Sequence, residues 1–140
     1  MSSKMKALVY SLFFALSILL FVAATYGLDA VYGTTICAHT GPEGMLWLLA
    51  PWVVLGLIAG WTAGRAGFHS GFIVFGVGVL LVGYAYWNGY HGSMIALQKH
   101  AWTAAALSLG FIPFVSVGLL VGIGILSLFL VHRRRTNDNE

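Results

Sequence analysis

The sequence predicts an all-α integral membrane protein, a bundle of four transmembrane helices. Hydrophobic residues make up 59% of its 140 residues and charged residues only 8%, whereas a soluble domain carries about 45–50% and about 25%. So few charges cannot cover a water-soluble globule of this mass, and so high an apolar content excludes a disordered chain. Cys37 is the only cysteine, which excludes an intrachain disulfide scaffold.

The charged residues leave four long uncharged runs, at residues 7–28, 44–64, 66–98 and 100–132. A helix needs about 20 apolar residues to cross the hydrocarbon core, and two spans with a turn need about 40 or more, so each run holds one span. Backbone groups in lipid must be paired internally, which favours helices, and the apolar runs lack the alternation of barrel strands. We therefore place spans in a single domain at about residues 7–26, 45–61, 71–90 and 103–131, before a polar tail at 132–140.

The fourth span is unusually long and contains a proline. Residues 101–131 would form a helix about 46 Å long, against a hydrocarbon core of about 30 Å. Pro113 removes one helical hydrogen bond, so we expect a long, tilted helix with a kink near Pro113. The alternative is a short interfacial helix that ends at Gly110, followed by a span from Pro113. Pro51 predicts a similar bend in the second span, and the tail from Thr136 to Glu140 is expected to be disordered.

Six of the seven Lys and Arg residues fall on one side of a four-span topology. They are Lys4, Lys6, Arg65, Arg133, Arg134 and Arg135. Positive residues in short loops remain in the cytoplasm, so both termini are expected there, with the protein in the plasma membrane (the inner membrane of a bacterium). The first span also has features of a cleavable signal, with Ala23 and Ala24 near a cleavage point, but its uncharged run exceeds the usual 7–15 apolar residues, which favours an uncleaved span.

Glycines at regular spacing predict where the helices pack, because small residues let helix backbones approach closely in lipid. The candidates are Gly56, Gly60 and Gly64 in the second span, Gly76 and Gly83 in the third, and Gly118 and Gly122 in the fourth. We expect these ridges to hold the bundle together. The alternative is that one ridge remains exposed for a partner or for homodimerisation.

A polar and aromatic stripe enters the outer part of the third span. Tyr84, Trp87, Asn88 and His91 lie at helical spacing and share one face. The stripe could line a shallow pocket for a quinone, lipid or peptide. Interfacial anchoring of the rings is the simpler interpretation and the favoured one.

The residues with metal-ligating side chains gather on the outer face. Cys37, His39, His91 and His100 carry groups that suit copper, zinc or haem. No pair has a tight ligand spacing, so we expect no metal and no cofactor.

The functional hypotheses follow from what the spans lack. No charged residue lies in the middle of a span, which argues against an exporter driven by a buried carboxylate. The net charge of +3 is explained by orientation and predicts no nucleic-acid partner. We expect a non-enzymatic protein that lies in the lipid bilayer and contacts a membrane-protein partner or its own copies, as an accessory or partner-restraining subunit. The alternatives are a small oligomeric transporter or channel subunit, and a redox or metal-binding protein that uses the outer histidines.

Overall fold

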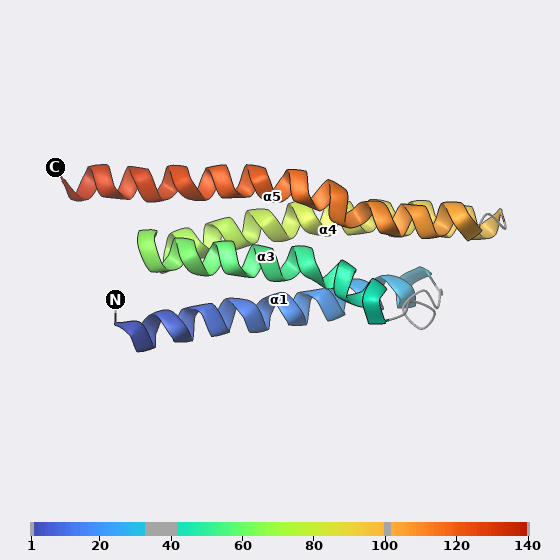
Figure 1. Ribbon diagram of the computed structural model, residues 1–140, viewed down its shortest axis with the longest axis horizontal. Helices are drawn as coiled ribbons and strands as arrows, with labels where there is room; N and C mark the ends of the chain where they lie inside the picture. The colour runs from blue at the N-terminus through green and yellow to red at the C-terminus, as the bar shows by residue number, and fades with distance from the viewer. Residues whose placement is uncertain (1, 33–41, 100–101, 140) are drawn as a thin grey trace.

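The computed structural model describes residues 2–32, 42–99 and 102–139, and this part of the chain forms four long helices (Figure 1). The helices are α1 (Ser3–Tyr32), α3 (Pro42–Ala66), α4 (Phe68–Gln98) and α5 (Trp102–Asp138). Each contains a segment that is long and apolar enough to cross a membrane. The predicted all-helical architecture with four transmembrane-length helices is confirmed, and it suggests a multi-pass membrane protein.

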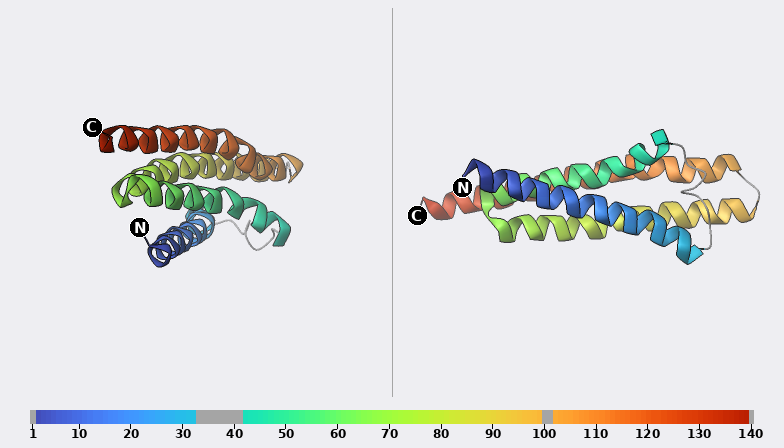
Figure 2. Two further views of the ribbon diagram at one scale, coloured as in Figure 1. Left: turned by 60° about the vertical axis from the view of Figure 1, so that its left-hand side comes forward. Right: turned by 90° about the horizontal axis from the view of Figure 1, so that it is seen from below.

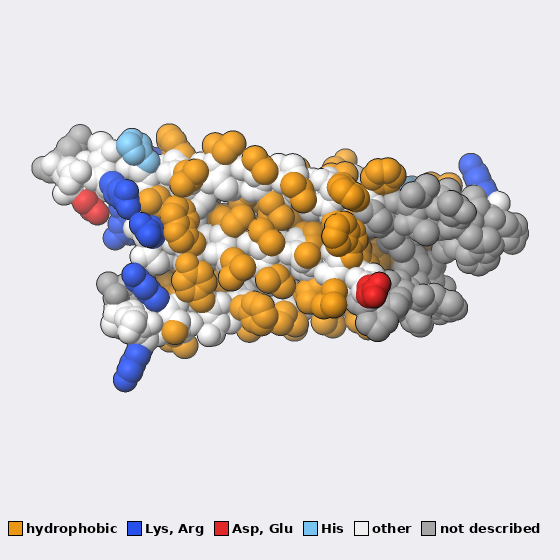
Figure 3. Space-filling view, viewed as in Figure 1, with side chains coloured by type: hydrophobic (Ala, Val, Ile, Leu, Met, Phe, Trp, Pro, Cys, Tyr) orange, Lys and Arg blue, Asp and Glu red, His pale blue; other side chains and the backbone are white. Residues whose placement is uncertain are grey.

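The helices lie side by side and alternate in direction, so both termini lie at one end of the bundle (Figures 1 and 2). Helix α3 packs against all three others, and α5 packs against α3 and α4. Figure 1 shows α1 and α5 on opposite sides of α3. The terminal end also carries the α3–α4 turn and the Lys and Arg side chains of residues 4, 6, 65 and 133–135, and we call it the basic end (Figure 3).

Aromatic side chains pack between the helices. The ring of Phe13 on α1 lies 5.3 Å from that of Phe72 and 5.4 Å from that of Phe75 on α4. Trp52 on α3 and Tyr86 on α4 are buried with their ring centroids 5.5 Å apart. In a bilayer, where lipid is as apolar as these side chains, their close packing rather than exclusion from water would hold the helices together.

The α3–α4 turn explains how one arginine contributes to the fold. Gly67 has φ of 100°, a left-handed conformation that only glycine adopts without strain, and it ends α3. The guanidinium of Arg134 on α5 donates a hydrogen bond to the carbonyl oxygen of Ala66. The last carbonyls of a helix lack intrahelical donors and carry partial negative charge. Arg134 therefore ties the end of α3 to α5, a role that its sequence position did not predict.

The extent of α5 excludes one of the two geometries considered for the fourth span and also the expected disorder of much of the tail. It is one helix from Trp102 to Asp138 with Pro113 inside it, so the alternative of a separate interfacial helix that ends at Gly110 is wrong. The expected disorder after Thr136 is also wrong through Asp138. There the Thr136 hydroxyl donates to the His132 carbonyl oxygen over 3.1 Å, and Arg134 lies 3.9 Å from the Asp138 carboxylate one turn away.

Candidate functional site

Only two of the predicted packing glycines bring helices of this chain together. A Cβ on Gly56 would meet the Ser17 hydroxyl and lie 3.0 Å from the Phe13 carbonyl oxygen, and a Cβ on Gly60 would lie 2.8 Å from the Tyr10 ring. These two glycines therefore allow α1 to lie directly against α3. Ser17 also donates a 2.8 Å hydrogen bond to the Phe13 carbonyl oxygen, so its hydroxyl fits into this contact without an unpaired donor.

The other five predicted glycines do not pack against another helix of the chain. They are Gly64, Gly76, Gly83, Gly118 and Gly122, where an added Cβ meets no atom within 4 Å in the part of the chain that the structure describes. Within the described residues no other helix approaches these positions closely, because regular glycine spacing identifies a flat helix face but not the direction in which it points. The alternative, that one of these ridges is exposed for a partner or for homodimerisation, remains a prediction.

Two glycines that the sequence reading missed take their place between α3 and α4. A Cβ on Gly71 would lie 3.0 Å from the Ala59 carbonyl oxygen, and a Cβ on Gly78 would lie 3.0 Å from a methyl carbon of Leu55. They are seven residues apart and so share a face. Their spacing alone does not single them out, because Gly76 and Gly83 in the same helix are also seven residues apart and meet no described atom within 4 Å.

The structure brings two of the four stripe residues into a groove. Tyr84 and Asn88 line a groove of about 400 Å³ between α4 and α5, together with Ile112 and Val115. Trp87 and His91 are exposed on the same helix but do not line it. The groove is largely apolar, with the Asn88 amide and the Tyr84 phenol as its polar groups.

The outer-face candidates for metal binding are mostly outside the described residues. Cys37, His39 and His100 fall in the undescribed segments, and His91 is exposed on α4. Among the residues that the structure does describe, no three His, Cys, Asp or Glu side chains lie close enough to share a metal ion.

Asp29 differs from its expected position. The predicted first span ends before Asp29, but α1 continues to Tyr32 and therefore includes it. Asp29 is the only charged side chain that is buried within the described ranges. A buried carboxylate near the end of an apolar helix is unusual. The sequence did not predict it, because α1 is longer than the predicted span.

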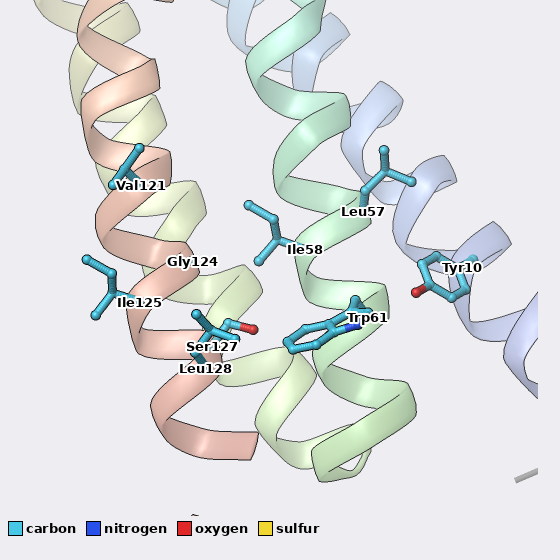
Figure 4. Close-up of a pocket in the computed structure, with 9 residues that line it drawn as sticks. All are labelled: Tyr10, Leu57, Ile58, Trp61, Val121, Gly124, Ile125, Ser127 and Leu128. Carbon is cyan, nitrogen blue, oxygen red and sulfur yellow. The ribbon is translucent and has the colours of Figure 1, made fainter. Parts of the chain in front are cut away.

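A second and larger groove lies on the α1–α3–α5 side of the bundle, toward the basic end (Figure 4). It has a volume of about 640 Å³, within the range of small-molecule sites. Its lining is almost entirely apolar, and the residues that define it include Tyr10 on α1, Ile58 and Trp61 on α3, and Val121, Ile125 and Leu128 on α5.

Few polar groups lie in or beside this groove. Ser127, one of its lining residues, shares a buried hydrogen bond with the Thr62 hydroxyl, which also donates to the Ile58 carbonyl oxygen over 2.8 Å. The guanidinium carbon of Arg65 lies 5.4 Å from the centre of the Trp61 ring, a cation–π distance. The groove therefore offers an apolar channel with a positive charge at one end, which suits an amphiphile better than a polar solute.

No known protein-family model matches this chain, and neither curated protein sequences nor solved structures show significant similarity to it.

Proposed function

We propose that this chain is a non-enzymatic multi-pass membrane protein that acts by helix–helix contact with a membrane partner, as an accessory or partner-restraining subunit. The observation that carries this proposal is one surface of α5. Gly118, Gly122 and Phe129 lie on a side of α5 that is exposed in the described structure, and we call these residues the free face of α5.

The free face has the chemistry of a transmembrane contact. Gly118 and Gly122 are one turn apart, and an added Cβ at either position meets no described atom within 4 Å. A second helix can therefore approach the backbone of α5 closely, as in small-xxx-small contacts. A glycine inside a helix costs about 1 kcal/mol relative to alanine, and no contact within the described chain offsets that cost here. Contact with a partner helix, from another protein or from a second copy, would offset it.

The test of this function is the effect of Gly118→Leu and Gly122→Leu on assembly. Purified in a mild detergent, the parent protein is expected to retain a stoichiometric partner or to form a homo-oligomer, measured by size-exclusion chromatography with light scattering. Either substitution should weaken that association about tenfold, the equivalent of about 1.4 kcal/mol, because the leucine separates the helices.

Gly76→Leu is the matched control, since Gly76 is also exposed on a helix and equally open. It should leave assembly unchanged, and none of the three variants should have a lower thermal midpoint than the parent. A parent protein that is purified only as a bare monomer, or assembly that is insensitive to both α5 substitutions, contradicts the proposal.

We also propose that the protein lies in the plasma membrane, or in the inner membrane of a bacterium, with both termini in the cytoplasm and a bend in α5 near Pro113. Six of seven Lys and Arg residues lie toward the basic end, which supports this orientation. A fluorescent protein that matures only in the cytoplasm should fluoresce when fused after Glu140. Alkaline phosphatase, active only outside, should be inactive at the same site, and the opposite pattern contradicts the orientation.

A further inference from the structure

The large groove is bounded by three helices and is open toward the medium that surrounds the bundle. Its floor is α3, and α1 and α5 form its two sides (Figure 4). Gly124 on α5 faces it without a side chain, and an added Cβ there would meet no described atom within 4 Å. The apolar side chains of Ile58, Val121 and Ile125 form most of its surface. In a membrane such a surface is filled by hydrocarbon.

Each of the three helices that bound the groove carries a positive charge at the basic end. Arg65 on α3 stacks on Trp61. Lys6 lies one turn before Tyr10 on α1, and Arg135 lies two turns beyond Leu128 on α5, so each cation shares a face with a lining residue. All three cations are exposed.

The described acidic side chains do not neutralise this rim. Asp138 is the acidic residue in the described part of the basic end, and it lies beside Arg134. Asp29 and Glu43 belong to the opposite end of the bundle. An anion beside Lys6 and Arg65 would therefore meet two cations, and the described parts of α1 and α3 carry no carboxylate at that end.

We infer that this groove binds one anionic phospholipid. An acyl chain lies along Ile58, Val121 and Ile125, and the phosphate lies at the rim near Arg65 and Lys6. Arginine suits the phosphate because its planar guanidinium can donate two parallel hydrogen bonds. The Trp61 ring, which contacts both the groove and Arg65, lies where chain and headgroup meet, the level that tryptophan prefers in a bilayer.

The dimensions favour a lipid chain over a partner helix. The groove extends along about two turns of α5, from Val121 to Leu128, and holds about 640 Å³. Two turns of a helix about 10 Å across occupy about 850 Å³, more than the groove contains. A partner helix at the free face of α5 would lie beside the groove rather than in it, so this inference is independent of the proposed partner contact.

The experiment compares lipids that differ only in headgroup. The protein is purified in detergent, and binding of dioleoyl phosphatidylglycerol and dioleoyl phosphatidylcholine is measured by native mass spectrometry over a concentration series. We expect the anionic lipid to bind with a stoichiometry of one and at least tenfold more tightly. Arg65→Gln and Lys6→Gln should each weaken its binding about fivefold, as expected for one cation near an anionic headgroup. Gly124→Leu should weaken it too, by filling the apolar channel.

Lys4→Gln is the charge-matched control, because Lys4 is exposed at the same end but two residues from Lys6 and so on another face of α1. Its affinity for phosphatidylglycerol should stay within twofold of the parent. Equal binding of the two lipids contradicts the inference, as does equal weakening by Lys4→Gln and Arg65→Gln, which would indicate attraction to the whole basic end. Binding of glycerol phosphate without acyl chains as tight as that of the lipid would also contradict it. Circular dichroism and the elution volume confirm that each variant is folded.

Discussion

Gly56→Leu is expected to separate α1 from α3 and to destabilise the bundle by about 3 kcal/mol, the upper part of the range for overpacking. At this position a Cβ already meets the Ser17 hydroxyl and comes within 3.0 Å of the Phe13 carbonyl oxygen. A backbone atom cannot move aside as the end of a side chain can, so the whole of α1 must shift. The loss should appear as a lower midpoint in denaturation by sodium dodecyl sulfate in mixed micelles.

The matched comparison is Gly76→Leu, which adds the same side chain to an exposed position where a Cβ meets no described atom within 4 Å. Its stability should match the parent or rise by up to about 1 kcal/mol, because leucine favours the helix more than glycine does. Gly60→Leu should fall between the two, since its neighbour is the ring of Tyr10. Equal stabilities of the Gly56 and Gly76 variants would show that α1 does not pack against α3 at Gly56.

Phe13→Ala is expected to cost about 2 kcal/mol of stability. Its side chain is 0% exposed, and its ring packs on those of Phe68, Phe72 and Phe75. The same change in a water-soluble core costs about 3–5 kcal/mol, which includes both transfer from water and the cavity. When separated helices remain in lipid or detergent, the transfer part is largely absent, and the lost packing contacts remain.

Phe14→Ala is the control for that variant, since Phe14 is the next residue and is 45% exposed. It should change the stability by less than about 0.5 kcal/mol. The two variants have the same composition and hydropathy, so any difference between them measures which side of α1 faces the bundle. A loss for Phe14→Ala as large as that for Phe13→Ala would contradict the packing of α1.

The two grooves show where sequence reasoning reached its limit. The stripe on α4 was recognised from helical spacing, but only Tyr84 and Asn88 line a groove, because α5 covers one edge of the stripe and not the other. The larger groove was not foreseen, since its lining comes from α1, α3 and α5. Residues from three separate helices meet only through the packing of those helices, and no spacing within one of them reveals it.

Asp29 and Arg134 show a second limit. Hydropathy located the apolar centre of each helix well, yet the helices continue through polar residues at their ends. A buried aspartate was therefore assigned to a loop, and an arginine assigned only to topology proved to bind the end of α3. Polar residues at helix ends can face water, lipid headgroups or another helix, and hydropathy alone does not distinguish these environments.

The sequence by itself determined that this protein is all-helical, that it has four transmembrane-length helices and where along the chain each one lies. Those properties depend on the length and polarity of continuous segments, which can be read along one dimension. The tertiary structure decided which side of each helix faces its neighbours. It selected Gly56, Gly60, Gly71 and Gly78 for close packing and left Gly118 and Gly122 exposed. The physical reason is that both the exposed and the buried sides of these helices are apolar, so hydropathy carries no signal that separates them.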